Sequence, residues 1–163
     1  DVYIPQLPRP LAVVATDLET LQPVTFVEGR LGRIVHASCA VPGLVAPVMI
    51  DGRAYGDGGV TNNLPAEAAR SLGADVVVGV DLFGPGAVAA RGPLPTGLAV
   101  VENFVRRSGG GLAAVDCLIS PPLGKASYFS FGRRSQLMAL TMGARAAEAA
   151  LPDIWQALEG APG

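Results

Sequence analysis

One aspartate in this chain has the surroundings that acid–base chemistry would need. Asp57 lies among three glycines, Gly56, Gly58 and Gly59, inside the run VMIDGRAYGDGGVTNNLP at residues 48–65. Glycines remove Cβ atoms where another backbone or a ligand must come close. The pattern therefore predicts a loop that presents a carboxylate from the end of a strand. The plainer interpretation is a turn that happens to contain an aspartate.

A hairpin must position that loop. Asp51-Gly52 has the residues that a tight turn between two strands requires, and the flanking segments 48–50 and 53–55 are short enough to pair across it. We therefore expect a hairpin immediately before the Asp57 loop.

Other residues that could do chemistry have simpler interpretations. His36, the single histidine, could complete a triad, but helical geometry turns it away from the stripe Leu31, Ile34, Val35 and Cys39 and predicts a surface position. Ser38 could be a nucleophile, but we expect a small residue that packs a helix against a sheet. Asp51, Asp57 and Asp81 match no metal-site spacing, and no G-x-G-x-x-G follows a strand, so no metal or dinucleotide is expected.

Composition bounds the class of protein. A length of 163 residues with 50% apolar residues suggests one domain with a substantial core. The net charge of −2 gives no general attraction to nucleic acid. Cys39 and Cys117 lie outside any ligand spacing. They could form a structural disulfide, but we expect two reduced, buried thiols in a cytoplasmic protein.

The order of apolar runs predicts an α/β fold. Strands are expected at residues 11–16, 24–27, 75–82 and 116–120, and helices at 30–40, 64–72, 100–107 and 133–151, with a short helix after Pro152. Asn63 is the expected N-cap of the helix at 64–72, and residues 83–96 are expected to form a surface loop. Because strands and helices alternate, we expect a mostly parallel central sheet.

The run ASCAVPG at residues 37–43 resembles the AS-x-A-x-PG run of the patatin-like phospholipases, a family of lipid acyl hydrolases. The following motifs resemble the family in the same order: a strand with Pro47, the Asp51-Gly52 hairpin, the DGG at residues 57–59, the N-x-P at 63–65 and the GAD at 73–75. The likeness extends over nearly the whole chain from residue 11. Each motif is weak alone, whereas the ordered set is specific.

The resemblance implies a three-layer α/β fold and hydrolysis of an acyl ester by a Ser–Asp dyad without histidine. Asp57 would be the acid of the dyad, Gly58 and Gly59 would shape its loop, and Asn62 and Asn63 would brace the loop through side-chain hydrogen bonds. The implied substrate is a phospholipid or another lipid ester. No cofactor is implied, and transient contact with a membrane surface is expected.

The chain departs from the family at the nucleophile. No G-x-S-x-G occurs, and none of Ser38, Ser108 and Ser130 has the complete flanking pattern. The glycines at 109–111 come after the aspartate, where a family oxyanion loop would not be, and they predict a helix break. We therefore expect residues 1–163 to be the C-terminal portion of a single patatin-like domain whose first strands, oxyanion loop and nucleophile elbow lie upstream.

Two other functions stay open at this point. The chain could be a non-catalytic lipid-binding or regulatory module that keeps the fold without the nucleophile. It could also be a different α/β hydrolase that uses His36. The sequence does not decide the head group, the acyl-chain length or the oligomeric state.

Overall fold

The computed structural model describes residues 1–83, 92–123 and 132–161. These residues form two compact units. The first unit comprises Asp1–Ala74 with Phe104–Ala114, and the second comprises Asp75–Asn103 with Val115–Gly163. Among the described residues, no helix combines the length and the apolar character needed to cross a bilayer.

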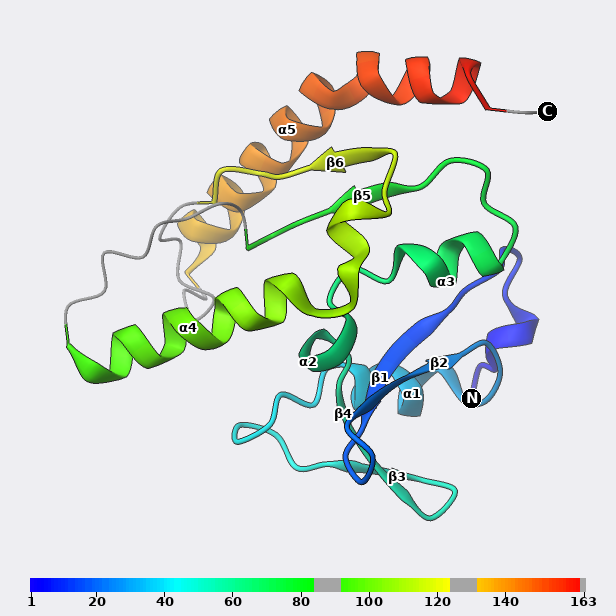
Figure 1. Ribbon diagram of the computed structural model, residues 1–163, viewed down its shortest axis with the longest axis vertical. Helices are drawn as coiled ribbons and strands as arrows, with labels where there is room; N and C mark the ends of the chain where they lie inside the picture. The colour runs from blue at the N-terminus through cyan, green and yellow to red at the C-terminus, as the bar shows by residue number, and fades with distance from the viewer. Residues whose placement is uncertain (84–91, 124–131, 162–163) are drawn as a thin grey trace. The chain divides into compact units, whose positions relative to one another are not determined.

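The first unit contains a four-stranded sheet in the order β2-β1-β4-β3 (Figure 1). Its strands are β1 (Val13–Asp17), β2 (Gln22–Phe26), β3 (Val48–Ile50) and β4 (Arg53–Asp57). The expected hairpin is confirmed, because β3 and β4 pair across Asp51 and Gly52. Both turn residues have positive φ, 49° at Asp51 and 82° at Gly52, as a tight two-residue hairpin turn requires.

The pairing in this sheet differs from the mostly parallel arrangement that we expected. All three of its strand pairs are antiparallel. Two of them are hairpins whose connections are too short for the crossover that a parallel pair needs. The expected parallel pairing occurs in the second unit, between β5 (Val78–Val80) and β6 (Cys117–Ile119).

The core of the first unit lies between the sheet and α1 (Leu31–Ser38). The buried cluster consists largely of small side chains, which allow the helix to approach the strands closely: Ala15, Ala37, Ala40, Val48 and Tyr55. Tyr55 also meets Phe26 edge to face, with ring centroids 5.2 Å apart. Of the predicted helical stripe Ile34 is buried but Val35 is exposed, and His36 is exposed as predicted.

Two short helices follow β4, namely α2 (Gly59–Asn62) and α3 (Ala66–Ser71). The 3-10 helix η2 (Ser108–Ala113) packs against both of them, and another 3-10 helix, η1 (Ile4–Gln6), lies near the N-terminus. Asn63 is not the N-cap that we expected, because it is the C-cap of α2 and Pro65 holds the N-cap position of α3. The predicted break at residues 109–111 is confirmed: Gly109 and Gly110 have φ of 75° and 70°.

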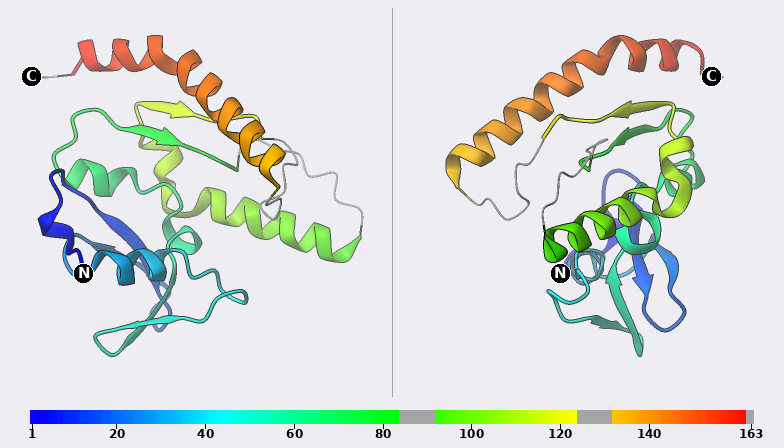
Figure 2. Two further views of the ribbon diagram at one scale, coloured as in Figure 1. Left: turned by 180° about the vertical axis from the view of Figure 1, so that it is seen from behind. Right: turned by 60° about the vertical axis from the view of Figure 1, so that its left-hand side comes forward.

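The second unit combines the β5–β6 pair with the long helix α5 (Arg133–Glu159), which contacts β6 and runs beside it in Figure 2. The predicted end of a helix at Leu151 was wrong, because Pro152 lies inside α5. The helix bends along its course instead of stopping (Figure 1), as a proline that removes one hydrogen bond permits. Helix α4 (Pro93–Arg107) begins inside the loop expected at 83–96. The rest of that loop, residues 84–91, and the candidate Ser130 lie outside the described residues.

Both cysteines are free thiols, as expected. Cys117 is buried in β6, whereas Cys39 is exposed at the end of α1, so the expectation that both are buried holds for one.

Candidate active site

Asp57 is the last residue of β4, and its backbone is fixed on both sides. Its N–H donates to the carbonyl of Ala40 at 2.9 Å, and its own carbonyl accepts a hydrogen bond from the Thr16 hydroxyl at 2.7 Å. Ala15 of β1 is its partner in the strand register. The aspartate therefore leaves the sheet from a well-defined position, with its side chain half-buried.

One oxygen of the Asp57 carboxylate has a fixed direction. Its Oδ1 accepts the backbone N–H of Gly59, the first residue of α2, at 2.7 Å. Within the described part of the chain this is the only hydrogen bond to the carboxylate, which leaves Oδ2 able to accept a proton from another group. A carboxylate held through one oxygen and open at the other has the form that a general base requires.

The glycines of the loop are explained by close backbone approach. A Cβ on Gly58 would lie 2.1 Å from the carbonyl oxygen of Val14 in β1, a distance that no side chain tolerates. A Cβ on Gly56 would lie 3.1 Å from the Leu18 side chain, and one on Gly59 would lie 3.0 Å from Asp57 Oδ1. Gly58 therefore allows the loop to cross β1, and Gly59 leaves room for the carboxylate.

The bracing of the loop differs from the prediction that Asn62 and Asn63 supply it through their side chains. Asn62 Oδ1 is buried and has no hydrogen-bond partner among the described residues. Asn63 takes part through its backbone N–H, which donates to the Ser108 hydroxyl at 3.0 Å. The side chains that hold the loop are hydroxyls: Thr16 lies 2.9 Å from the hydroxyl of Thr61 in α2, and Ser108 contacts both ends of α2.

Ser38 packs α1 against the sheet, as predicted. Its hydroxyl donates to the carbonyl of Val14 at 2.7 Å, and its carbonyl accepts the N–H of Gly58 at 3.3 Å. The hydroxyl hydrogen is thus engaged by a backbone acceptor. Ser38 fastens the Asp57 loop to α1 and β1.

The other predicted candidates lie on elements other than the Asp57 loop. His36 is exposed on α1, Asp51 lies in the exposed hairpin turn, and Asp81 belongs to the second unit. Over residues 1–83, 92–123 and 132–161, no three His, Cys, Asp or Glu side chains lie close enough together to hold a metal ion.

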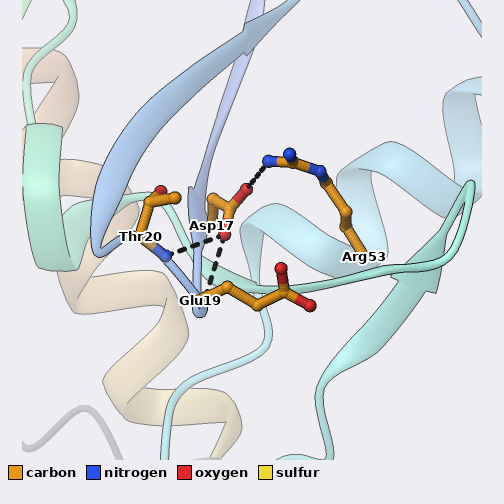
Figure 3. A network of polar contacts seen from close by, with 4 residues as sticks. All are labelled: Asp17, Glu19, Thr20 and Arg53. Atoms are coloured by element: carbon orange, nitrogen blue, oxygen red, sulfur yellow. Dashed lines mark hydrogen bonds and ion pairs between the residues drawn. The ribbon is translucent and has the colours of Figure 1, made fainter.

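A second carboxylate, Asp17, stabilises the strand that carries Asp57 (Figure 3). Its side chain is 1% exposed and accepts the backbone N–H groups of Glu19 at 2.9 Å and Thr20 at 3.1 Å, and the Arg53 guanidinium at 2.7 Å. The hydrogen bond from Thr20, supported by those from Glu19 and Arg53, lowers the pKa of Asp17 against the opposing effect of burial. The network joins the β1–β2 turn to β4.

The lowered pKa of Asp17 predicts a pH-dependent contribution to stability. Its stabilising effect is complete above the unfolded-state pKa of about 4 and is lost as the pH falls through the lower folded-state pKa. The Asp17→Asn variant should therefore unfold several degrees below wild type at pH 7, with the difference shrinking toward pH 3. Thermal unfolding followed by circular dichroism measures this, and a difference that stays constant over that range would refute the role assigned to Asp17.

Two hollows on the first unit are not lined by the Asp57 loop. The larger, about 620 Å³, lies among residues of the N-terminal segment, α1 and the β3–β4 turn, including Tyr3, Phe26, Ile34 and Ile50. The smaller, about 290 Å³, is lined mainly by residues 4–11. Neither is assigned to an acyl chain.

The motifs around Asp57 match a known family. Residues 4–70, which include Asp57 and all four strands of the first unit's sheet, match the family model described as patatin-like phospholipase. This segment is therefore similar to the patatin-like phospholipases. The resemblance drawn from the ordered motifs is thereby confirmed for this segment.

The matches to individual relatives are longer than the match to the family model. The chain is 40% identical over 107 residues to uncharacterised NTE family proteins of Mycobacterium bovis and Mycobacterium tuberculosis, a match that covers 66% of this chain and 30% of those proteins. It is 38% identical over 84 residues to patatin-like phospholipase domain-containing protein 7 of Rattus norvegicus, covering 50% of this chain and 6% of that protein. The chain thus spans only a small part of the relatives it matches.

Sequence reasoning overlooked Thr16 and considered Ser108 only as a nucleophile. Thr16 stands at the end of an apolar strand and Ser108 at the end of a helix, where hydroxyl residues are common. The triple glycine after Ser108 was the available signal that this segment approaches another backbone closely.

Proposed function

We propose that this chain supplies the general base of a Ser–Asp dyad that hydrolyses acyl esters of lipids, with Asp57 as that base. The observation that carries the proposal is the carboxylate itself, held through Oδ1 by Gly59 N–H and open at Oδ2, on a loop where Gly58 admits no side chain. The family match over residues 4–70 supports a lipid hydrolase.

The chemistry follows from the direct pairing of a carboxylate with serine. Asp57 Oδ2 removes the serine proton as the hydroxyl oxygen attacks the ester carbonyl, and the proton passes to the departing alcohol when the acyl-serine forms. In the second half, Asp57 removes a proton from the attacking water and returns it to the serine oxygen as the acyl–serine bond breaks, which releases the fatty acid and restores both groups. No cofactor enters either step.

We further propose that residues 1–163 form the C-terminal portion of the catalytic domain and that the nucleophile lies upstream in the parent protein. The absence of any G-x-S-x-G and the order of the motifs support this division. The second unit supports it independently: among its described residues the sheet has two strands, β5 and β6. Two strands alone are marginally stable, so we expect further strands to pair with their edges in the complete domain.

The proposed division predicts that the present chain alone is catalytically silent. Purified residues 1–163 should not hydrolyse a p-nitrophenyl ester above the rate of a heat-inactivated control, because the serine that forms the acyl intermediate is missing. Turnover clearly above that control, abolished by a serine-directed inhibitor, would show that the nucleophile lies within these residues and would overturn the division.

The runner-up, a non-catalytic lipid-binding module, makes the opposite prediction for the parent protein. A full-length protein that binds phospholipid vesicles but shows no esterase activity, with no G-x-S-x-G upstream, would favour the module. A full-length esterase whose activity depends on Asp57 would favour the dyad.

A further inference from the structure

Ser108 connects the end of α4 to the loop that carries Asp57. It is half-buried and is the first residue of η2, directly after Arg107 at the end of α4. Its hydroxyl oxygen accepts the backbone N–H of Asn63 at 3.0 Å and lies 2.8 Å from the carbonyl oxygens of Gly59 and Val105. Gly59 and Asn63 lie at the two ends of α2, so one hydroxyl contacts both.

The hydrogen-bonding capacity of a hydroxyl defines what Ser108 can do. The single O–H donates to either the Gly59 or the Val105 carbonyl, while the oxygen accepts from Asn63. The bond to Val105 alone is the ordinary contact of a serine at a helix end. The bond from Asn63 is different, because it satisfies a half-buried backbone donor 45 residues away along the chain.

Two glycines allow Ser108 to reach the loop. A Cβ on Gly109, which has φ of 75°, would lie 2.3 Å from Asn62 Oδ1, and a Cβ on Gly111 would lie 1.6 Å from the carbonyl oxygen of Leu64. The backbone of η2 is therefore in direct contact with α2 and with Leu64. This approach is incompatible with any side chain at either position, and it fixes where the Ser108 hydroxyl lies.

The connection to Asp57 passes through one residue. Gly59 donates its N–H to Asp57 Oδ1 at 2.7 Å, and its carbonyl faces the Ser108 hydroxyl at 2.8 Å. The two groups belong to adjacent peptide planes at the start of α2, so a displacement of that turn would disturb both hydrogen bonds. A hydroxyl that contacts both ends of α2 therefore also limits movement of the Gly59 N–H. The orientation of the Asp57 carboxylate thereby depends on Ser108.

We propose that Ser108 is a positioning residue for Asp57: its hydroxyl holds α2 at both ends and so keeps the carboxylate aimed at the nucleophile. This inference rests on the proposed Ser–Asp function. It assigns to the segment after α4, outside the residues that match the family, a defined part in the geometry of the dyad.

The test compares three variants in the full-length protein. Ser108→Ala should lower kcat for a p-nitrophenyl ester about tenfold with KM nearly unchanged, since one hydrogen bond orients the base and none binds substrate. Ser108→Thr, which keeps the hydroxyl, should restore most of the rate. Ser71→Ala removes a hydroxyl that bonds only within its own exposed helix, to the Glu67 carbonyl at 2.9 Å, and should match wild type.

Hydrogen exchange gives a readout independent of catalysis. The amides of Gly59 and Asn63 should exchange faster in Ser108→Ala than in wild type, while amides of the β1–β2 pair should not change. Wild-type kcat in Ser108→Ala, or unchanged exchange at both amides, would overturn this inference alone. Retained activity in Asp57→Asn would overturn the proposed dyad itself, whatever the exchange result.

Discussion

The Asp57→Asn variant of the full-length protein should fold normally and lose esterase activity by about 10³-fold or more. The amide has the size of the carboxylate, and its oxygen can still accept the Gly59 N–H that holds Oδ1 at 2.7 Å. It cannot remove a proton from serine. Because a dyad has no histidine to take over that role, the loss should reach the upper range for general-base catalysis. Steady-state kinetics with a chromogenic ester and a thermal unfolding curve measure both parts.

Two control variants isolate the effect of Asp57. Asp51→Asn makes the same chemical change in an exposed hairpin turn where φ is 49°, a conformation that asparagine also adopts readily, so its rate should match wild type. His36→Ala removes the single histidine from the exposed side of α1 and should also be near wild type. Loss of esterase activity in His36→Ala, or an Asp57→Asn rate within a few-fold of the wild-type rate, would mean that another group is the base.

The second large effect is expected at Gly58. Gly58→Ala would place a methyl group 2.1 Å from the Val14 carbonyl oxygen and 2.8 Å from its carbon, both backbone atoms of the central strand β1. Either the loop or β1 must move, and the loop movement would also displace Asp57. We expect a loss of about 3 kcal/mol or more in the free energy of unfolding, together with loss of activity.

Gly32→Ala is the matched control for Gly58→Ala. Gly32 lies inside α1 on its exposed side, where an added Cβ would meet no atom within 4 Å. Alanine there should leave stability unchanged or raise it by about 0.5–1 kcal/mol, because glycine is unfavourable within a helix. Urea unfolding followed by circular dichroism compares the two, and equal midpoints for both variants would contradict the close approach at Gly58.

Local features were predictable from the sequence because their causes lie within a few residues. The hairpin at Asp51 and Gly52 follows from the turn preference of the pair, and the helix break after Ser108 follows from three successive glycines. The α/β class follows from the alternation of apolar runs. The continuation of α5 through Pro152 shows that even a strong local signal can be overridden in a long helix that packs on β6.

Pairings between distant residues were not predictable in the same way. The antiparallel pairing of β1 with β4 joins residues about 40 positions apart, and the sequence of neither strand identifies the strand that it pairs with. The same holds for Thr16 and Ser108, whose hydroxyls bond to the Asp57 loop from 41 to 49 residues away. Asn62 and Asn63 do not brace the loop through their side chains, because the hydrogen-bond partners available to a side-chain amide depend on the backbone that packs against it. At Asn62 that backbone is Gly109, which offers the side-chain oxygen no donor.

The most direct test of the dyad is to locate the nucleophile in the full-length protein with a fluorophosphonate, which reacts covalently with an activated serine. Mass spectrometry of wild type should find a single adduct on a serine of a G-x-S-x-G motif upstream of the residues described here, and Asp57→Asn should acquire that adduct at least a hundredfold more slowly. Equal labelling rates in wild type and Asp57→Asn would contradict the assignment of Asp57 as the base, and an adduct on Ser38 or Ser108 would contradict the upstream position of the nucleophile.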